Sequence, residues 1–191
     1  MGLVYGFHSL DPAVVARLIG TSASDLVKEL KARGKTPEDV GSESWDEIDE
    51  NAALTHLATT KEWDVDKSME DLRMIPGLAT ELTPVALLLE EMEDLTASSL
   101  PERFHAPEMG LIGIGMPPRI AAAATAIGAF TGTQGRTRLS EARLPLFQRL
   151  LSRGLRKRIR DDAYVWEHWT HLAEAIQWAH SRNEWLGLHM A

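Results

Sequence analysis

Apolar residues recur at every second position near both ends of the chain. Leu3, Tyr5 and Phe7 alternate with the residues between them, and this spacing predicts a short strand. Residues 185–190 predict a closing strand, and the glycine-rich residues 109–116 predict a further one. We therefore expect two or three strands, with one near each end of the chain.

The residues between these strands show helical spacing preceded by helix-capping side chains. Asp11-Pro12 and the Ser22/Asp25 pair are typical of helix starts. Asp64 or Asp66 would cap a helix that runs to Met74. The other predicted helices cover residues 44–57, 85–95, 119–130, 140–153 and 162–181, with loops over 128–135 and 153–160.

Strands that are set apart from runs of helices favour an α+β fold over an alternating βαβ fold. The length of 191 residues predicts one domain over 1–191. The composition, 44% hydrophobic and 25% charged, excludes an intrinsically disordered chain and a disulfide scaffold. The sequence has no cysteine, which excludes a thiolate nucleophile, an iron–sulfur cluster and a zinc site with sulfur ligands.

The N-terminus lacks the basic and apolar regions of a signal peptide. The longest apolar run, near residues 120–130, is shorter than the ~20 residues that span a bilayer. We therefore expect a cytoplasmic protein with no membrane association. Arginine outnumbers lysine 14 to 6, a usage typical of bacterial genomes rich in GC.

The net charge of −8 averages two different halves. Residues 1–102 contain 21 acidic and 8 basic residues, whereas residues 103–191 contain 7 acidic and 12 basic residues. Charge asymmetry of this kind indicates either halves that fold against each other or an interaction segment.

A basic run gives the second half its charge; its cations are Arg153, Arg156, Lys157, Arg158 and Arg160. Arginine side chains suit phosphate or carboxylate recognition, because their donors can bind two oxygens at once. The run is therefore either a solvated loop between helices or a patch for an anion or a protein partner. Nucleic acid is not expected, since no aromatic residue interleaves the run to stack on bases.

Two histidines and a glutamate repeat at helical spacing near the C-terminus. His168, His171 and Glu174 are three residues apart, so a helix would place them on neighbouring turns. Imidazole and carboxylate groups suit a transition metal or general acid/base catalysis. The alternative is an amphipathic helix with histidines at the margin of its apolar face, and we expect no bound cofactor.

Asp64 and Asp66, with Lys67, place two carboxylates and an amine within four residues. Such groups could perform acid/base catalysis if they were buried together, or they could simply cap a helix. The glycine-rich segments 110–115 and 132–135 match neither the dinucleotide-binding nor the phosphate-loop pattern, and no Gly-x-Ser-x-Gly motif occurs. Four of the six tryptophans lie in residues 166–185, where they would serve a core or a partner surface.

Several short segments, in order, resemble the YfbM-like bacterial proteins of unknown function. They are Met1–Gly6 with Leu10-Asp-Pro, Asp64–Lys67 with Leu72, Leu82–Val85 with Leu95, Pro101–Phe104, and Leu172–Met190. Residues 34–60 and 119–160 depart from that pattern, and the tryptophan expected after Asp64–Lys67 is absent. The resemblance implies a helix-rich single α+β domain whose small sheet pairs the N- and C-terminal strands. It implies no catalytic residue.

Two functions follow as hypotheses. The first is a non-catalytic binding module for a protein partner, a second copy of the chain or a small ligand. It depends on the charge asymmetry, the tryptophans and the lack of a complete catalytic motif. The second is a small hydrolase or lyase that uses His168 or His171 as acid or base, with Asp64 and Asp66 or an arginine to orient it.

Overall fold

The computed structural model describes residues 5–18, 20–66, 69–93, 110–142, 144 and 146–190. The strands are β1 (Tyr5–Leu10), β2 (Thr59–Asp66), β3 (Gly110–Gly115) and β4 (Trp185–Met190). The helices are α1 (Pro12–Leu18), α2 (Ala23–Ala32), α3 (Glu50–Ala58), α4 (Met69–Met74), α5 (Thr83–Glu93), α6 (Pro117–Ile127), α7 (Gly132–Ser140), α8 (Leu146–Leu151), α9 (Arg153–Asp161) and α10 (Ala163–Arg182). Short 3₁₀ turns connect several of them.

The strands form one sheet in the order β2-β1-β4-β3, and every neighbouring pair is antiparallel. Strand β1 lies beside β4, with Phe7 opposite Leu188, so the N- and C-terminal strands pair as expected. The strands are set apart from runs of helices, which confirms the predicted helix-rich α+β class. Within the described residues, none of the helices has the length and apolar character needed to cross a membrane.

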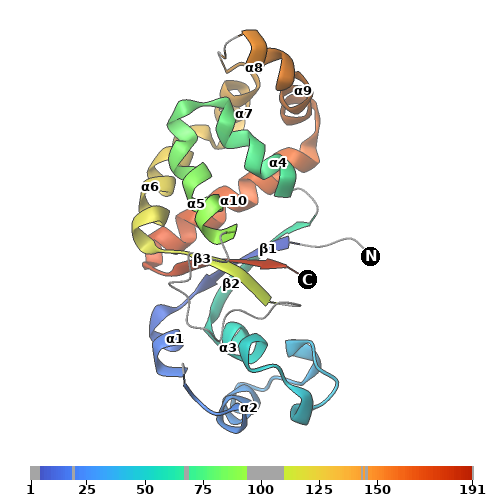
Figure 1. Ribbon diagram of the computed structural model, residues 1–191, viewed down its shortest axis with the longest axis vertical. Helices are drawn as coiled ribbons and strands as arrows, with labels where there is room; N and C mark the ends of the chain where they lie inside the picture. Colours follow the sequence, from blue (N-terminus) through green and yellow to red (C-terminus); the bar gives the residue numbers. More distant parts are fainter. Residues whose placement is uncertain are drawn as a thin grey trace.

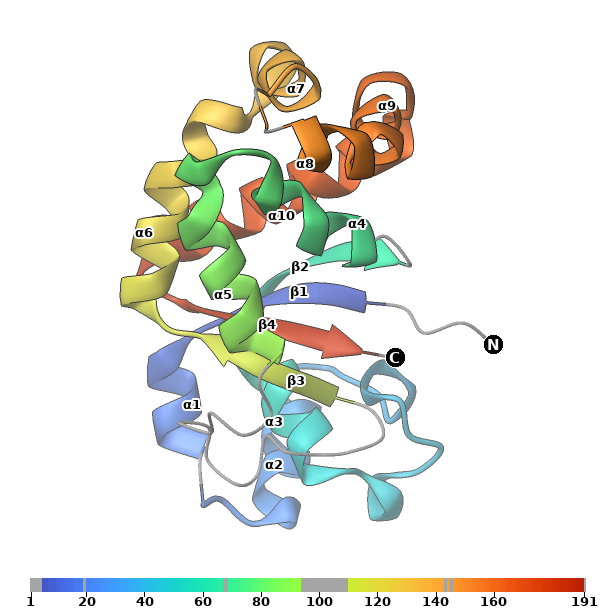
Figure 2. The ribbon, with the colours of Figure 1, turned by 45° about the horizontal axis from the view of Figure 1, so that its top comes forward.

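Helices cover both faces of the sheet, so the molecule has three layers (Figures 1 and 2). Helices α4, α5, α6 and α10 lie on one face, whose core includes Phe7, Val65 and Leu188, and α7 to α9 continue this layer beyond the sheet. Helices α1 to α3 pack on the other face, against Leu10 and Ile114. The alternation of side chains along each strand sends neighbouring residues to opposite faces, and one sheet thereby serves two separate cores.

The prediction that Asp64 or Asp66 caps a helix is wrong, because both residues belong to β2. Trp63 and Val65 are buried under α10, and β2 pairs with β1 along its whole length. The helix that runs to Met74 begins at Met69 instead. Pairing with a distant strand decided this segment, and no local pattern reports such pairing.

Other boundaries also differ from expectation, and the helix predicted over 140–153 is confined to α8 (Leu146–Leu151). The helix predicted from Ser44 begins at Glu50, with the Asp49 carboxylate accepting from the Ala52 N–H at 2.7 Å. Residues 132–140 form α7 and the basic run forms α9, although loops were predicted over 128–135 and 153–160. Helix α9 is stable as a helix because Leu155 and Ile159, one turn apart, are both buried.

Candidate functional site

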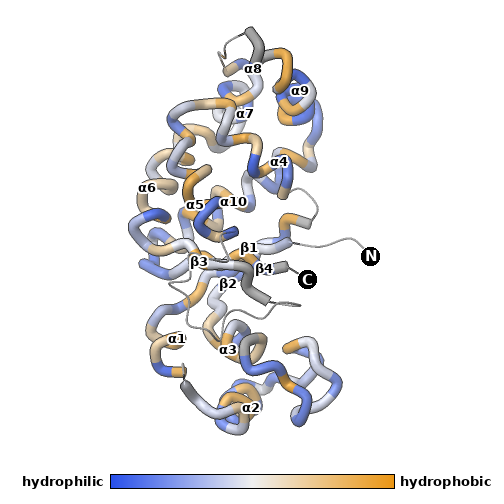
Figure 3. The backbone as a smooth tube through the Cα atoms, in the orientation of Figure 1, coloured by the Kyte–Doolittle hydropathy of each residue, from blue (hydrophilic) through white to orange (hydrophobic). Residues whose placement is uncertain are grey.

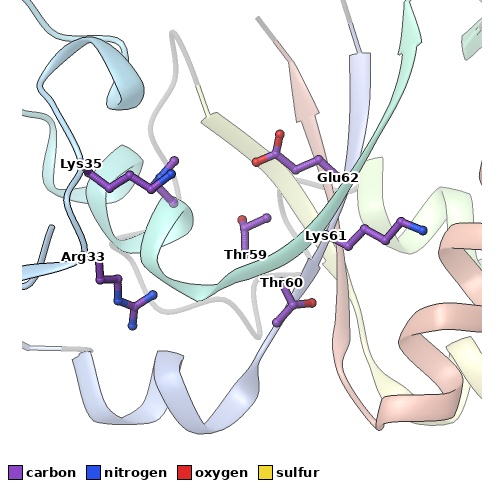
Figure 4. A pocket seen from close by; sticks show the side chains of 7 residues that line it. Arg33, Lys35, Thr59, Thr60, Lys61 and Glu62 are labelled. Atoms are coloured by element: carbon purple, nitrogen blue, oxygen red, sulfur yellow. The ribbon is translucent and has the colours of Figure 1, made fainter.

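A pocket of about 410 Å³ lies where the end of α2, helix α3 and the start of β2 meet. Arg33 and Lys35 lie on one side of it, with Thr59 and Glu62 on the other (Figure 4). The remaining lining residues are His56, Thr60 and Lys61. A volume of this size is sufficient for a small ligand, and the lining is dominated by polar and charged groups.

Arg33 follows the last turn of α2, and its guanidinium is already oriented by the protein. It donates to the Leu57 carbonyl at 2.9 Å and to the Glu29 carboxylate at 3.3 Å. Lys35 forms no ion pair with a described residue. Since a guanidinium carries five N–H donors, this side of the pocket presents both unused donors and positive charge.

His56 adds a third nitrogen-bearing side chain to the pocket. Burial lowers the pKa of His56, and the positive charge of Lys35 lowers it further, while Glu62 and Asp39 oppose that shift. A negatively charged ligand beside Lys35 would oppose that shift in the same way, because an anion stabilises the protonated imidazole. Protonation of His56 and the binding of an anion would therefore favour each other.

Two further histidines lie behind the pocket, in the sheet itself. The rings of His8 in β1 and His189 in β4 meet edge to face, with 5.0 Å between their centroids. Burial, and then the neighbouring His189 and His56, lower the pKa of His8 to about 4. Burial also lowers the pKa of His189. At neutral pH His8 is therefore an uncharged imidazole.

The contacts of His8 differ from those of a catalytic triad. Thr59 Oγ1 donates its one hydrogen to the Thr55 carbonyl at 2.8 Å, so it can only accept from His8 Nδ1, 3.4 Å away. Glu62 also approaches Nδ1, at 3.7 Å. A relay requires the acid and the nucleophile on different ring nitrogens, and this arrangement instead fixes the orientation of the ring.

The histidines predicted as site residues, His168 and His171, belong to α10. This helix packs on the opposite face of the sheet from α1 to α3. His168 is only 6% exposed, and among the described residues neither of its ring nitrogens has a hydrogen-bond partner. Its ring contacts those of Tyr164 and His171, at centroid distances of 4.2 and 5.7 Å. Glu174 is exposed. No group of three or more metal-ligating side chains occurs within the described part of the chain.

Of the predicted site residues on α10 and β2, His171 and Asp64 are in contact, but this contact involves the Asp64 backbone and not its carboxylate. His171 Nδ1 lies 2.8 Å from the Asp64 carbonyl oxygen, while the Asp64 side chain is exposed and alternates with the buried Trp63 and Val65. The side chain of Asp66, and Lys67, lie outside the described residues. None of His168, His171, Asp64 and Asp66 lines the pocket beside β2.

The basic run divides into paired and unpaired cations. Arg158 binds the buried Asp71 through both of its terminal nitrogens; burial raises the pKa of Asp71, and Arg158 opposes that shift. Arg160 pairs with the adjacent Asp161. Arg153, Arg156 and Lys157 form no ion pair with a described residue. The positive charge available to a partner is therefore smaller than the sequence suggests.

The C-terminal tryptophans serve the core and its edge. Trp169 is fully buried and donates to the Phe130 carbonyl at 2.9 Å. Trp178 lies between two cations, with Lys61 Nζ 4.6 Å and the Arg182 guanidinium carbon 4.7 Å from its ring centroid. The Lys61 side chain thus points toward α10, away from Lys35 (Figure 4).

The sequence reasoning missed Arg33, Lys35, His56 and Glu62 as candidates. They come from the end of α2, from α3 and from β2, which the packing of α2 on α3 brings together. One signal was present: residues 59–65 alternate, with Trp63 and Val65 on one face and polar residues between them. Reading that alternation as a strand would have placed Glu62 opposite the buried face.

Comparisons with protein-family models, curated proteins and solved structures find no match to this chain. No activity can therefore be transferred from a relative, and the resemblance to YfbM-like proteins stays a prediction. The functional argument depends on the chain's own residues.

Proposed function

We propose that this protein is a non-catalytic cytoplasmic binding module whose ligand is a small molecule with a carboxylate or phosphate group. The observation that carries this proposal is the convergence of Arg33, Lys35 and His56 on one pocket. Arginine and lysine bind such anions through charge-assisted hydrogen bonds, and threonine hydroxyls supply further polar contacts.

The opposite wall restricts the ligand further. Glu62, 60% exposed at its side chain, places a carboxylate across the pocket from Lys35 (Figure 4). It would repel a second anionic group and attract an ammonium or hydroxyl group. The pocket therefore favours a ligand with an anion at one end and a hydrogen-bond donor at the other.

Two features support binding over catalysis at this site. The His8 contacts orient the ring and leave Thr59 without a base on its hydroxyl hydrogen, which the Thr55 carbonyl accepts. The histidines predicted as acids or bases, His168 and His171, lie on α10, outside the pocket. The hydrolase or lyase hypothesis thus has no observation in its favour here.

The proposal is tested by titrating the ¹⁵N-labelled protein with inorganic phosphate and, separately, with β-alanine, against sodium chloride at equal ionic strength. We expect amide shifts concentrated at residues 33–35 and 56–62, with saturation for at least one probe. Lys35→Ala should weaken that binding, whereas the matched variant Lys157→Ala, on α9, should leave it unchanged. Equal responses from the two variants would contradict an ion site at this pocket.

A further inference from the structure

Among the described residues, exposed charges of opposite sign lie at the two ends of the molecule's longest axis (Figure 1). Helices α8 and α9 form one end, and α2 with the segment between α2 and α3 forms the other (Figure 1). Hydrophilic stretches are visible at both ends (Figure 3). The two ends differ in sign, and each also carries apolar surface.

The basic end, here named the α8–α9 tip, consists of Leu150, Leu151, Arg153 and Lys157. Arg153 and Lys157 are exposed and one helical turn apart, on a helix whose other face buries Leu155 and Ile159. Leu150 and Leu151 are 65% and 72% exposed. Among the described residues, no other large apolar side chain is exposed to that degree.

The acidic end, here named the acidic segment, covers residues 38–50. It contains seven carboxylates and no lysine or arginine, and Glu43, Asp46 and Glu47 are exposed without an ion pair to a described residue. Trp45 and Ile48, both half-buried, interleave these acids. The segment thus has the opposite charge to the tip, and its apolar side chains are less exposed because they also pack against the core.

We propose that the α8–α9 tip of one molecule binds the acidic segment of a second copy of this chain. The two surfaces complement each other in charge, and each carries apolar side chains beside its charges. A single molecule cannot make this contact within itself, because the two surfaces lie at opposite ends (Figure 1). Two copies can make it twice in an antiparallel dimer, and further copies can extend it into chains.

The size and charge of the two surfaces determine how strong the association should be and how it should depend on salt. Each surface is smaller than a standard protein interface, so association is weak. Its charges are exposed, and a Debye length of about 10 Å at 0.1 M salt screens them. Association should therefore increase with protein concentration at low ionic strength and disappear as salt is added.

Sedimentation velocity of the full chain in 20 and 500 mM sodium chloride tests the proposal. The first variant, Arg153→Glu with Lys157→Glu, makes both ends acidic. The second, Glu43→Lys with Glu47→Lys, lowers the net charge of the acidic segment from −7 to −3 and places two lysines among its exposed carboxylates. At low salt each should weaken association by about tenfold or more, because like charges then face each other.

Rescue separates a specific contact from general charge repulsion. A chain that carries all four substitutions again has opposite charges at positions 43 and 47 and at positions 153 and 157, and it should associate again, as should an equimolar mixture of the two double variants. The control Arg17→Glu with Lys28→Glu changes net charge as much as the tip variant does, but at α1 and α2, and should not weaken association. A wild-type chain that stays monomeric at low salt, or association that neither double variant reduces, would overturn the proposal.

Discussion

The two faces of the sheet carry different kinds of side chain. The face toward α4 to α6 and α10 is mostly apolar, with Phe7, Val65 and Leu188 among its buried residues. The face toward α1 to α3 has a smaller apolar core and, beside it, His8, His189 and the pocket. The same strands supply both faces, since their side chains alternate.

This difference indicates a division between stability and binding. Burial of apolar surface is the dominant favourable contribution to folding, and most of that surface lies under α4 to α10. The other face holds histidines whose pKa values burial lowers, which costs stability at low pH. Substitutions on the two faces should therefore differ in size and in pH dependence.

Trp169→Ala should have the largest effect on the apolar face. Trp169 is fully buried and its indole N–H donates to Phe130, so its truncation should lower the free energy of unfolding by about 3–5 kcal/mol. Urea denaturation at pH 7 measures this loss. Trp45→Ala, at a half-buried position on the other face, should cost less, and a larger loss there would reverse the comparison.

The polar face should make stability depend on pH through His8. Its pKa of about 4 in the folded protein lies below the ordinary 6.5, so below pH 6.5 the unfolded chain binds a proton that the folded chain does not. The free energy of unfolding should be highest above pH 7 and should fall between pH 6.5 and 4, by at most about 3 kcal/mol. Denaturation curves across that range measure it.

His8→Asn removes this titration and should flatten the pH profile, at the cost of a lower plateau. The matched variant His180→Asn replaces an exposed histidine of α10 and should keep the wild-type slope. An unchanged slope in His8→Asn would show that His189 or the carboxylates produce the pH dependence instead.

Close packing on the apolar face can be tested at a glycine of β3. A Cβ added at Gly113 would meet the backbone of Met92 in α5, so Gly113→Ala should destabilise the protein by about 1–3 kcal/mol through overpacking. Gly128→Ala is the control, since its nearest neighbour would be the Gln177 side chain at 3.9 Å. Thermal unfolding of both variants compares them, and equal melting temperatures would contradict the predicted clash.

The sequence predicted the features that depend on local chemistry. The cap at Ser22 and the terminal strands are confirmed, because side-chain capping and alternation involve only neighbouring residues. Strand β2 was missed, since Asp64 and Asp66 resemble helix caps until the pairing with β1 is known. Helix α9 was missed because its charges concealed Leu155 and Ile159.

The candidate site was less accessible to sequence reasoning than the fold. Arg33, His56 and Glu62 lie in three separate elements, and no motif links them. His168 and His171 have the helical spacing that suggested a metal or acid/base site. Instead, His168 packs against Tyr164, and His171 contacts the backbone of β2. Spacing along a helix reports which side chains share a face, but it does not report which face borders a pocket.

The smallest expected effect on stability belongs to the pocket itself. Lys35 has no ion pair with a described residue, so Lys35→Ala should change the free energy of unfolding by less than about 0.5 kcal/mol. It should also raise the pKa of His56, because the charge of Lys35 opposes protonation of that ring. Denaturation and an NMR titration of the imidazole measure the two quantities separately. A stable variant with a raised His56 pKa would show that this cation acts on the pocket and not on the fold; a loss above 1.5 kcal/mol would assign Lys35 to the core of the polar face instead.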